Sequence, residues 1–202
     1  MTETQQALLA ARPDFAAIAR WVSHGARVLD LGCGDGALLR YLWEAREAPG
    51  YGVEIDDAEV VACVRNDINV LQLDLESGLS LFRDASFDTV ILSETLQTIH
   101  RIEQLLGEML RVGREAIVSF PNFGHWASRL QVLLGRMPVS EELPYEWYDT
   151  PNVHLCTTLD FEDLCRKLRV RIRERVALHE GRQISFLPNL LGSLAVYRCA
   201  AA

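Results

Sequence analysis

The sequence has no apolar run of the length that crosses a membrane, no internal repeat and no low-complexity tract. A membrane-spanning helix needs about 20 predominantly apolar residues. The N-terminal stretch MTETQQALLAARPDF also lacks the basic residues followed by an apolar run that mark a secretion signal. These absences argue against a membrane protein, a repeat protein and a secreted protein, and we expect a cytoplasmic one.

Paired cysteines are also missing. The five cysteines are odd in number and form no Cys-x-x-Cys motif, so we expect reduced thiols rather than a disulfide framework. His154 and Cys156 have the spacing of two metal ligands, but no second pair of ligands matches them, and tetrahedral zinc needs four. We therefore expect no metal site.

Positive charge is scarce. Lysine and arginine number 20 against 28 aspartates and glutamates, which gives a net charge of -8. Proteins that bind a nucleic-acid backbone present a basic surface, so the composition argues against nucleic acid as a partner. The 202 residues suffice for one domain with a sizeable core and are few for two, so we expect a single domain over residues 1–202.

Short strands rich in Val, Ile and Leu alternate with helical segments as far as residue 120. This alternation predicts a mostly parallel sheet that is covered by helices on both faces. The predicted strands cover residues 27–32, 51–55, 69–73, 87–93 and 115–120, and the predicted helices cover 13–23, 37–46, 57–66 and 101–113.

The pattern changes after residue 120. Residues 121–152 contain four prolines and several aromatic residues, and we expect an irregular insertion there with one helix at 125–134. Long insertions in compact domains are often lids or binding loops. We expect this one to close over a ligand, with Trp126, Trp147 and Tyr148 as an apolar wall; the alternative is that its aromatic residues pack on the core.

The C-terminal part is predicted to form a helix at 159–168 and two strands, at 169–178 and 193–199. The link between these strands is too short for a crossover helix, so we expect them to pair antiparallel. Arginines occupy positions 169, 171, 173 and 175, which predicts a stripe on one face of a strand. The stripe either discourages aggregation at a sheet edge or docks a partner.

The stretch VLDLGCGDG, residues 28–36, joins a buried strand to a helix through glycines, which brings backbone N–H groups close to a ligand. The loose dinucleotide pattern is present, but Asp30 and Asp35 would repel a pyrophosphate, which disfavours NAD. Two carboxylates suit a ligand that carries positive charge. S-adenosylmethionine, with its ammonium and sulfonium groups, has this property.

Acids also end the next two strands. In open parallel sheets the ligand crosses the carboxyl ends of the strands, so Glu54 is placed to accept ribose hydroxyls. Asp56 and Asp57 are better suited to begin the following helix. Asp74 is placed near the adenine amino group, although an aspartate after a strand is also a common turn residue. The predicted ligand site comprises Asp30, Gly32, Cys33, Gly34, Gly36, Glu54, Ile55, Asp74, Leu75 and Ser93.

These motifs, together with FDTVILSETLQTIH at 87–100, resemble those of class I S-adenosylmethionine-dependent methyltransferases. The resemblance implies a Rossmann-like doubly wound α/β sheet of seven mostly parallel strands with an antiparallel C-terminal strand. The longer block VSFPNFGHWASRLQVLLGRMPVSEELPYEWYDTPNVHLCT is similar to the MetW family of methionine biosynthesis proteins. By motif order this second resemblance spans roughly residues 15–199.

The MetW resemblance implies a partner, the homoserine O-acyltransferase (MetX) of methionine synthesis. The chain would then be an S-adenosylmethionine-binding subunit, with S-adenosylhomocysteine as the product form of the ligand, that supports or regulates this enzyme. The alternative is an autonomous methyltransferase of a small molecule. Methyl transfer needs mainly positioning and sometimes a general base, for which His100, Glu94 and His125 are the candidates. No acceptor is identified, because SETL (93–96) replaces the Asn/Asp-Pro-Pro-aromatic turn of many nitrogen methyltransferases.

Overall fold

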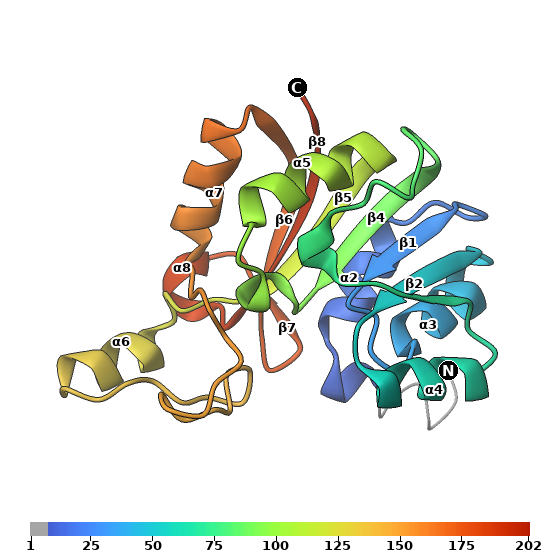
Figure 1. Ribbon diagram of the computed structural model, residues 1–202. Coiled ribbons are helices and arrows are strands. Elements are labelled where there is room, and N and C mark those ends of the chain that lie inside the picture. The colour runs from blue at the N-terminus through green and yellow to red at the C-terminus, as the bar shows by residue number, and fades with distance from the viewer. Residues whose placement is uncertain (1–7) are drawn as a thin grey trace.

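The computed structural model, which describes residues 8–202, is built on one sheet of eight strands (Figure 1). Five strands are parallel and three at the C-terminal end are antiparallel. The strands are β1 (Val28–Leu31), β2 (Gly50–Glu54), β3 (Val70–Gln72), β4 (Phe87–Ser93), β5 (Gly113–Pro121), β6 (Val170–His179), β7 (Arg182–Ile184) and β8 (Leu194–Ala201). Their order across the sheet is β3-β2-β1-β4-β5-β8-β6-β7.

Helices cover both faces of this sheet. One buried cluster joins Phe15, Leu42 and Cys63 to the sheet, and the other joins Met109 and Phe161 to the opposite face. The first cluster contains side chains of α2 (Asp14–Trp21), α3 (Ala37–Arg46) and α4 (Asp57–Arg65), and the second contains side chains of α5 (Ile102–Val112) and α7 (Thr158–Lys167). The remaining helical segments are η1 (Leu75–Ser77), η2 (Leu96–Thr98), α6 (Trp126–Leu133) and α8 (Pro188–Leu191). Every helix among the described residues is too short or too polar to span a bilayer.

The predicted fold class is confirmed, with one difference. The sheet has eight strands rather than seven, because Arg182–Ile184 forms a short β7 that pairs with the end of β6. The predicted antiparallel pairing of the two C-terminal strands is also confirmed, since β6 pairs with β8 and β8 with β5. Three residues with mostly exposed side chains give β7 no hydrophobic alternation that a sequence pattern detects.

The predicted arginine stripe on β6 is wrong. The register shifts between Ile172 and Glu174, so Arg173 is an extra residue in the strand and the alternation reverses after it. Arg175 consequently lies on the same face as Ile172 and forms an ion pair with Glu162 of α7. The arginines therefore do not share one face of β6.

Residues 123–157, called here the projecting segment, leave the sheet after β5 and return at α7. Figure 1 shows α6 standing away from the body of the molecule, at the end remote from β1–β3. The side chain of Asn122 closes the base of this segment: it accepts hydrogen bonds from the N–H groups of Gly124 and Thr158 and donates to the carbonyls of Asn189 and Gly192.

The apolar wall predicted for this segment is not formed by the three aromatic residues. The side chains of Trp126, Trp147 and Tyr148 are 49%, 70% and 72% exposed, so they do not pack as an apolar wall in this structure. The alternative, packing on the core, is also wrong for these three residues. The insertion instead presents its aromatic residues to solvent.

Candidate functional site

The turn from Gly32 to Gly36 connects the end of β1 to the first turn of α3. Gly32 has φ +69° and Gly34 has φ +53°, a region that favours glycine. A Cβ atom on Gly32 would lie 2.7 Å from the hydroxyl oxygen of Thr95, whereas one on Gly34 would meet nothing closer than the Glu59 carboxylate at 3.9 Å. Gly32 is thus required by packing, and Gly34 leaves open space in front of its backbone.

Asp30 is the penultimate residue of β1, two residues before Gly32, and its side chain is almost completely buried, at 2% exposure. The oxygen Oδ1 has no hydrogen-bond partner among the described residues. Burial raises the pKa of Asp30 to about 7, with Asp14 and Glu54 adding to the rise and Arg12 opposing it. A buried carboxylate with an unused acceptor is a site for a cationic group.

Glu54 lies at the carboxyl end of the neighbouring strand, β2. Its Oε2 accepts a hydrogen bond from the Gly34 N–H at 2.9 Å, and its Oε1 accepts from Ile55 and Asp56 at 2.7 and 3.1 Å. The carboxylate is therefore fixed against the glycine turn by backbone donors. Asp56, rather than Glu54, caps α4 by accepting from Ala58 and Glu59, as the sequence predicts.

Four further predicted residues lie around these two strand ends. Asp74 accepts from the Glu76 N–H at 2.9 Å and so caps η1, the turn role that was its alternative interpretation. Ile55 follows β2 and is 60% exposed, while Leu75 packs against the core on the α5 side. Cys33 is buried in the turn, with its sulfur 3.8 Å from that of Cys63. Burial raises the pKa of Cys33, so its thiol is protonated and is a packing group.

The five cysteines are free thiols, as the odd number predicts. His154 is exposed, and its N–H donates to the carbonyl of Gln97 in η2. Within residues 8–202, no three His, Cys, Asp or Glu side chains are grouped so that they could hold a metal ion.

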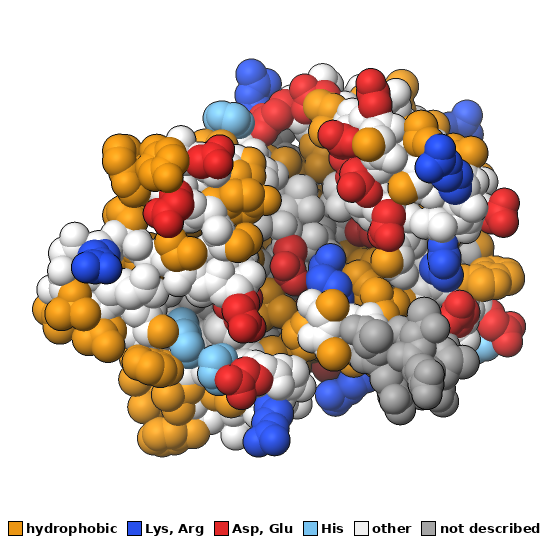
Figure 2. Space-filling view, turned by 90° about the horizontal axis from the view of Figure 1, so that it is seen from below, with side chains coloured by type: hydrophobic (Ala, Val, Ile, Leu, Met, Phe, Trp, Pro, Cys, Tyr) orange, Lys and Arg blue, Asp and Glu red, His pale blue; other side chains and the backbone are white. Residues whose placement is uncertain are grey.

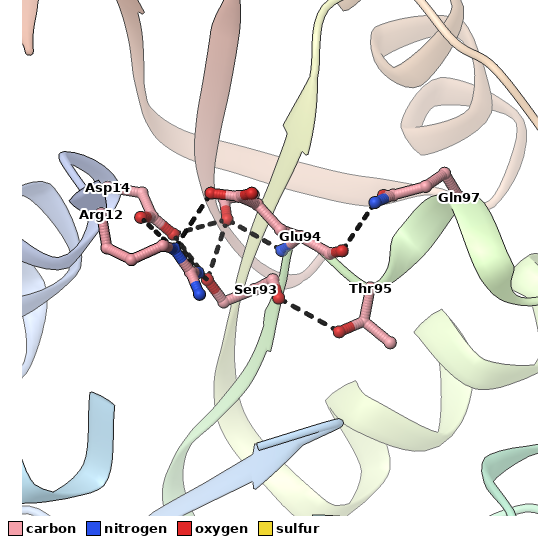
Figure 3. A network of polar contacts seen from close by, with 7 residues as sticks. Arg12, Asp14, Ser93, Glu94, Thr95 and Gln97 are labelled. Atoms are coloured by element: carbon pink, nitrogen blue, oxygen red, sulfur yellow. Dashed lines mark hydrogen bonds and ion pairs between the residues drawn. The ribbon is translucent and has the colours of Figure 1, made fainter. Parts of the chain in front are cut away.

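Ser93 belongs to a polar network that sequence analysis did not find (Figure 3). The Arg12 guanidinium forms an ion pair with Asp14 at 3.0 Å and donates to the Ser93 hydroxyl at 2.6 Å. Asp14 is fully buried and also accepts from the hydroxyls of Ser93 and Ser119, at 2.5 and 3.0 Å. The network links the start of α2 to the carboxyl ends of β4 and β5, which are far away in the sequence.

Glu94 is bound to the same network. Its carboxylate lies 3.1 Å from the Arg12 Nε, and its N–H donates to the side chain and carbonyl of Ser119. The backbone of Glu94 has φ +52°, which is unfavourable for a residue with a side chain. Burial raises the pKa of Glu94 to about 7; Asp14 and Glu142 add to the rise, and Arg12 opposes it. Glu94 can therefore hold or release a proton near neutral pH.

Glu94 opens on a cavity of about 330 Å³ between the N-terminal residues, the base of the projecting segment and the ends of β6 and β8. His125 lies in its wall beside His179, with the ring centroids 4.8 Å apart. Burial and the neighbouring His179 lower the pKa of His125, which favours a neutral imidazole. The cavity is further lined by Glu142 and Ser193.

The three candidate bases are thus divided by the structure. Glu94 and His125 line one cavity. The side chain of His100 is 67% exposed and its Nδ1 lies 3.4 Å from Glu76, outside that cavity. Only the first two are placed to act on one bound molecule.

The family model for methionine biosynthesis protein MetW matches residues 12–199. The bifunctional methionine biosynthesis protein MetXA/MetW of Rhodopirellula baltica is 39% identical over 212 aligned residues, which cover 96% of this chain and 34% of that protein. The chain thus spans about a third of the length of this relative.

Solved structures share the fold at low identity. A putative methyltransferase of Haloferax volcanii, solved in complex with the Trm112 methyltransferase activator, aligns with a TM-score of 0.70 at 16% identity, over 98% of this chain and 94% of that one. An S-adenosylmethionine-dependent methyltransferase of Mesorhizobium loti aligns with a TM-score of 0.69 at 16% identity, over 94% and 97%. The chain has the class I methyltransferase fold and belongs to the MetW family of methionine biosynthesis proteins.

Proposed function

We propose that this chain binds S-adenosylmethionine, or its demethylated product S-adenosylhomocysteine, at the carboxyl ends of β1–β3 and supports homoserine O-acyltransferase (MetX) as its subunit. The observation that carries the first half is Asp30, a buried carboxylate whose Oδ1 has no partner among the described residues. A ligand with an ammonium or sulfonium group brings a positive charge next to this carboxylate, and an ammonium N–H can also donate to Oδ1.

The other residues of the site fit the remaining parts of such a ligand. A carboxylate has about four lone-pair positions, and the backbone occupies three of those on Glu54. The free position on Oε2 accepts a ribose hydroxyl. The open face of Gly34 admits the ligand close to the backbone. We assign the adenine amino group to Asp74, whose Oδ1 also accepts from the Glu76 N–H.

The relative from Rhodopirellula baltica supports the second half of the proposal. Its name assigns MetXA and MetW to one bifunctional protein, and this chain corresponds to 34% of its length. A natural fusion keeps its two units at high effective concentration, as tethered binding modules do. We infer that this chain associates with a homoserine O-acyltransferase unit in the same way.

Binding of the ligand to this chain would allow the association to regulate the activity of the acyltransferase. S-adenosylmethionine is made from methionine, so its binding reports the output of the pathway to the enzyme that begins it. Such a ligand changes the activity of a partner only if it binds the free and the complexed chain with different affinity. We propose that it does.

The cavity beside Glu94 favours a second function, that of an autonomous small-molecule methyltransferase. Glu94 has a pKa near neutrality, and His125 is held neutral in the same wall. Both are suited to accept a proton from an acceptor that is being methylated. In this alternative the cavity holds the acceptor, and no acyltransferase is needed.

Two measurements test these proposals. Calorimetry with S-adenosylmethionine should show binding to the native chain and a loss of roughly 1–3 kcal/mol in Glu54→Ala, because one hydroxyl then has no acceptor. Equal affinity in both proteins, or a preference for NAD, contradicts the ligand assignment. Since the same change removes the acceptor of three backbone N–H groups, the unfolding temperature of the variant is the control.

The partner is tested by the activity of the homoserine O-acyltransferase from the same cell, measured alone, with this chain, and with this chain plus S-adenosylmethionine. Activation by the chain and a further change with the ligand support the whole proposal. If the chain changes nothing, the methyltransferase becomes the better interpretation. If it activates and the ligand has no effect, the regulatory part is wrong.

A further inference from the structure

The projecting segment exposes large hydrophobic side chains along most of its length. Leu133 is 82% exposed, Tyr148 72%, Trp147 70% and Leu134 69%. Figure 2 shows hydrophobic side chains gathered at the end of the molecule that carries α6. The other exposed members are Trp126, Leu130, Val132, Met137, Val139 and Tyr145. We call these ten side chains the apolar surface.

The apolar surface has the size of a protein interface. A whole aromatic side chain offers about 150–250 Å², so at their exposed fractions the four rings alone present roughly 350–600 Å². The five aliphatic side chains and Met add to this area. One partner contributes about 800 Å² to a standard protein–protein interface. Soluble monomers rarely leave an apolar patch of this size facing water.

The surface is held in one shape. The side-chain amide of Gln131 in α6 donates to the carbonyl of Val139 and accepts from its N–H, at 3.1 and 3.2 Å. Leu143 is buried beneath the loop, and the N–H of Val153 donates to the Gln97 carbonyl at 2.8 Å. The aromatic residues are therefore presented by ordered backbone and do not belong to a loose tail.

The charged residues around the apolar surface indicate which charges a complementary partner carries. Glu141, Glu146 and Asp149 are exposed in the loop that follows α6, and their side chains surround the aromatic pair Trp147 and Tyr148 along the chain. A matching partner offers an apolar face with basic residues at its rim. The segment also carries the exposed Arg129 and Arg136, but its four acidic residues outnumber these two arginines. A second copy therefore brings two surfaces of net negative charge together, which like-charge repulsion disfavours.

We propose that the apolar surface is the docking face for the homoserine O-acyltransferase. The inference rests on the proposed function, which names this partner, and it adds the place where the partner binds. The projecting segment starts at the carboxyl end of β5, on the same edge of the sheet as the glycine turn, and α6 extends away from β1–β3 (Figure 1). The base of the projecting segment adjoins Glu94, which links the docking face to the ligand edge through the Arg12 network.

The experiment compares paired substitutions in the full chain by pull-down and calorimetry with the acyltransferase. Leu133→Ser/Leu134→Ser and Trp147→Ala/Tyr148→Ala alter the apolar surface. Leu81→Ser and Trp43→Ala are the controls, because these side chains are 73% and 58% exposed but lie elsewhere. We expect each surface variant to weaken binding about tenfold or more, as loss of aromatic and apolar anchors does, and the controls to bind as the native chain.

The outcomes separate the two proposals. If the native chain does not bind or activate the acyltransferase, the proposed function fails. If the native chain binds and the surface variants bind equally well, the function stands and the docking face is wrong. Light scattering on the chain alone provides the remaining outcome: a dimer that the surface variants dissociate, with acyltransferase binding retained, overturns the proposal in favour of self-association. Calorimetric titration of S-adenosylmethionine should give one affinity for all variants, which shows that they are folded.

Discussion

The glycine-turn edge and the projecting segment differ in which kind of side chain they expose to solvent. At the edge, charged groups are buried: Asp14 is inaccessible and Asp30 is 2% exposed. On the projecting segment, apolar groups are exposed, with Leu133 at 82% and Tyr148 at 72%. Either arrangement costs free energy in the isolated chain, because buried charge and exposed apolar surface are both unfavourable in water.

The contrast indicates two kinds of partner. The free-energy cost of a buried carboxylate without a hydrogen-bond donor is offset by a small cationic ligand, which places a single positive charge beside it. An extended apolar surface is removed from water only when another surface of similar size covers it, and a protein provides such a surface. A ligand and a protein can thus bind the same chain without competing for the same residues.

The largest loss of stability is expected for Arg12→Ala at the glycine-turn edge. This change leaves the buried Asp14 carboxylate without its cation. Removing one partner of a buried ion pair costs about 3–5 kcal/mol, and the Asp14 side chain is fully inaccessible. Urea unfolding of the ligand-free chain should show this loss. Arg20→Ala changes an exposed residue of α2, the helix that contains Asp14; it is the control and should change stability by less than about 0.5 kcal/mol. The double variant Arg12→Ala/Asp14→Ala should regain part of the loss; no recovery would contradict an ion-pair origin.

Asp30→Asn should increase the free energy of unfolding, whereas Arg12→Ala should decrease it. The pKa of Asp30 is about 7 in the folded chain and 3.8 ordinarily, so ionisation favours unfolding. The penalty is absent below about pH 4, grows as the pH rises to about 7 and is constant above, and linkage allows it to reach up to about 4 kcal/mol. The variant should therefore be more stable than the native chain at pH 8 and equal to it at pH 4. If the variant and the native chain are equally stable at both pH values, burial does not disfavour the ionised form of Asp30.

Gly32→Ala and Gly34→Ala separate packing from access to the ligand. A Cβ atom on Gly32 collides with Thr95, so we expect a loss of about 2–3 kcal/mol in the free energy of unfolding. A Cβ atom on Gly34 meets open space and should cost only about 1 kcal/mol from its backbone conformation. Gly34→Ala should nevertheless weaken S-adenosylmethionine binding in calorimetry. Unchanged binding would show that the ligand does not approach this face.

The smallest effect is expected on the projecting segment. Leu133→Ser removes an apolar side chain that is 82% exposed, and surface changes of this kind alter stability by less than about 0.5 kcal/mol. Solubility of the isolated chain should increase, because an exposed apolar group is lost. A thermal melt that falls by several degrees would show that Leu133 packs against the fold.

The layered sheet is the part of the structure that local sequence patterns determine. Short apolar strands such as Val28–Leu31 and helices such as α5 were predicted within one or two residues, since burial on a helix face or on both faces of a strand leaves a periodic signal. The bulge at Arg173 leaves no such signal, because one extra residue depends on the pairing with β8. This single residue turned a predicted stripe into side chains on two faces.

The site divides in the same way. Asp30, Glu54 and the glycines were predicted as one edge because the carboxyl ends of parallel strands meet, and the structure brings them together. The Arg12–Asp14 pair was missed because its partners, Ser93 and Ser119, are distant in sequence and each is an ordinary polar residue at a strand end. Aromatic density in the projecting segment was detected, but it does not distinguish a lid from an exposed surface.

The hydrogen bonds of Asn122 have a consequence for the entropy of association. By joining Gly124 and Thr158 at one side chain, Asn122 closes the whole projecting segment into a loop whose two ends are fixed before any partner arrives. The free energy of loop closure is then part of folding and does not oppose docking. A partner meets a surface that is already ordered, and more of the contact energy remains available as affinity.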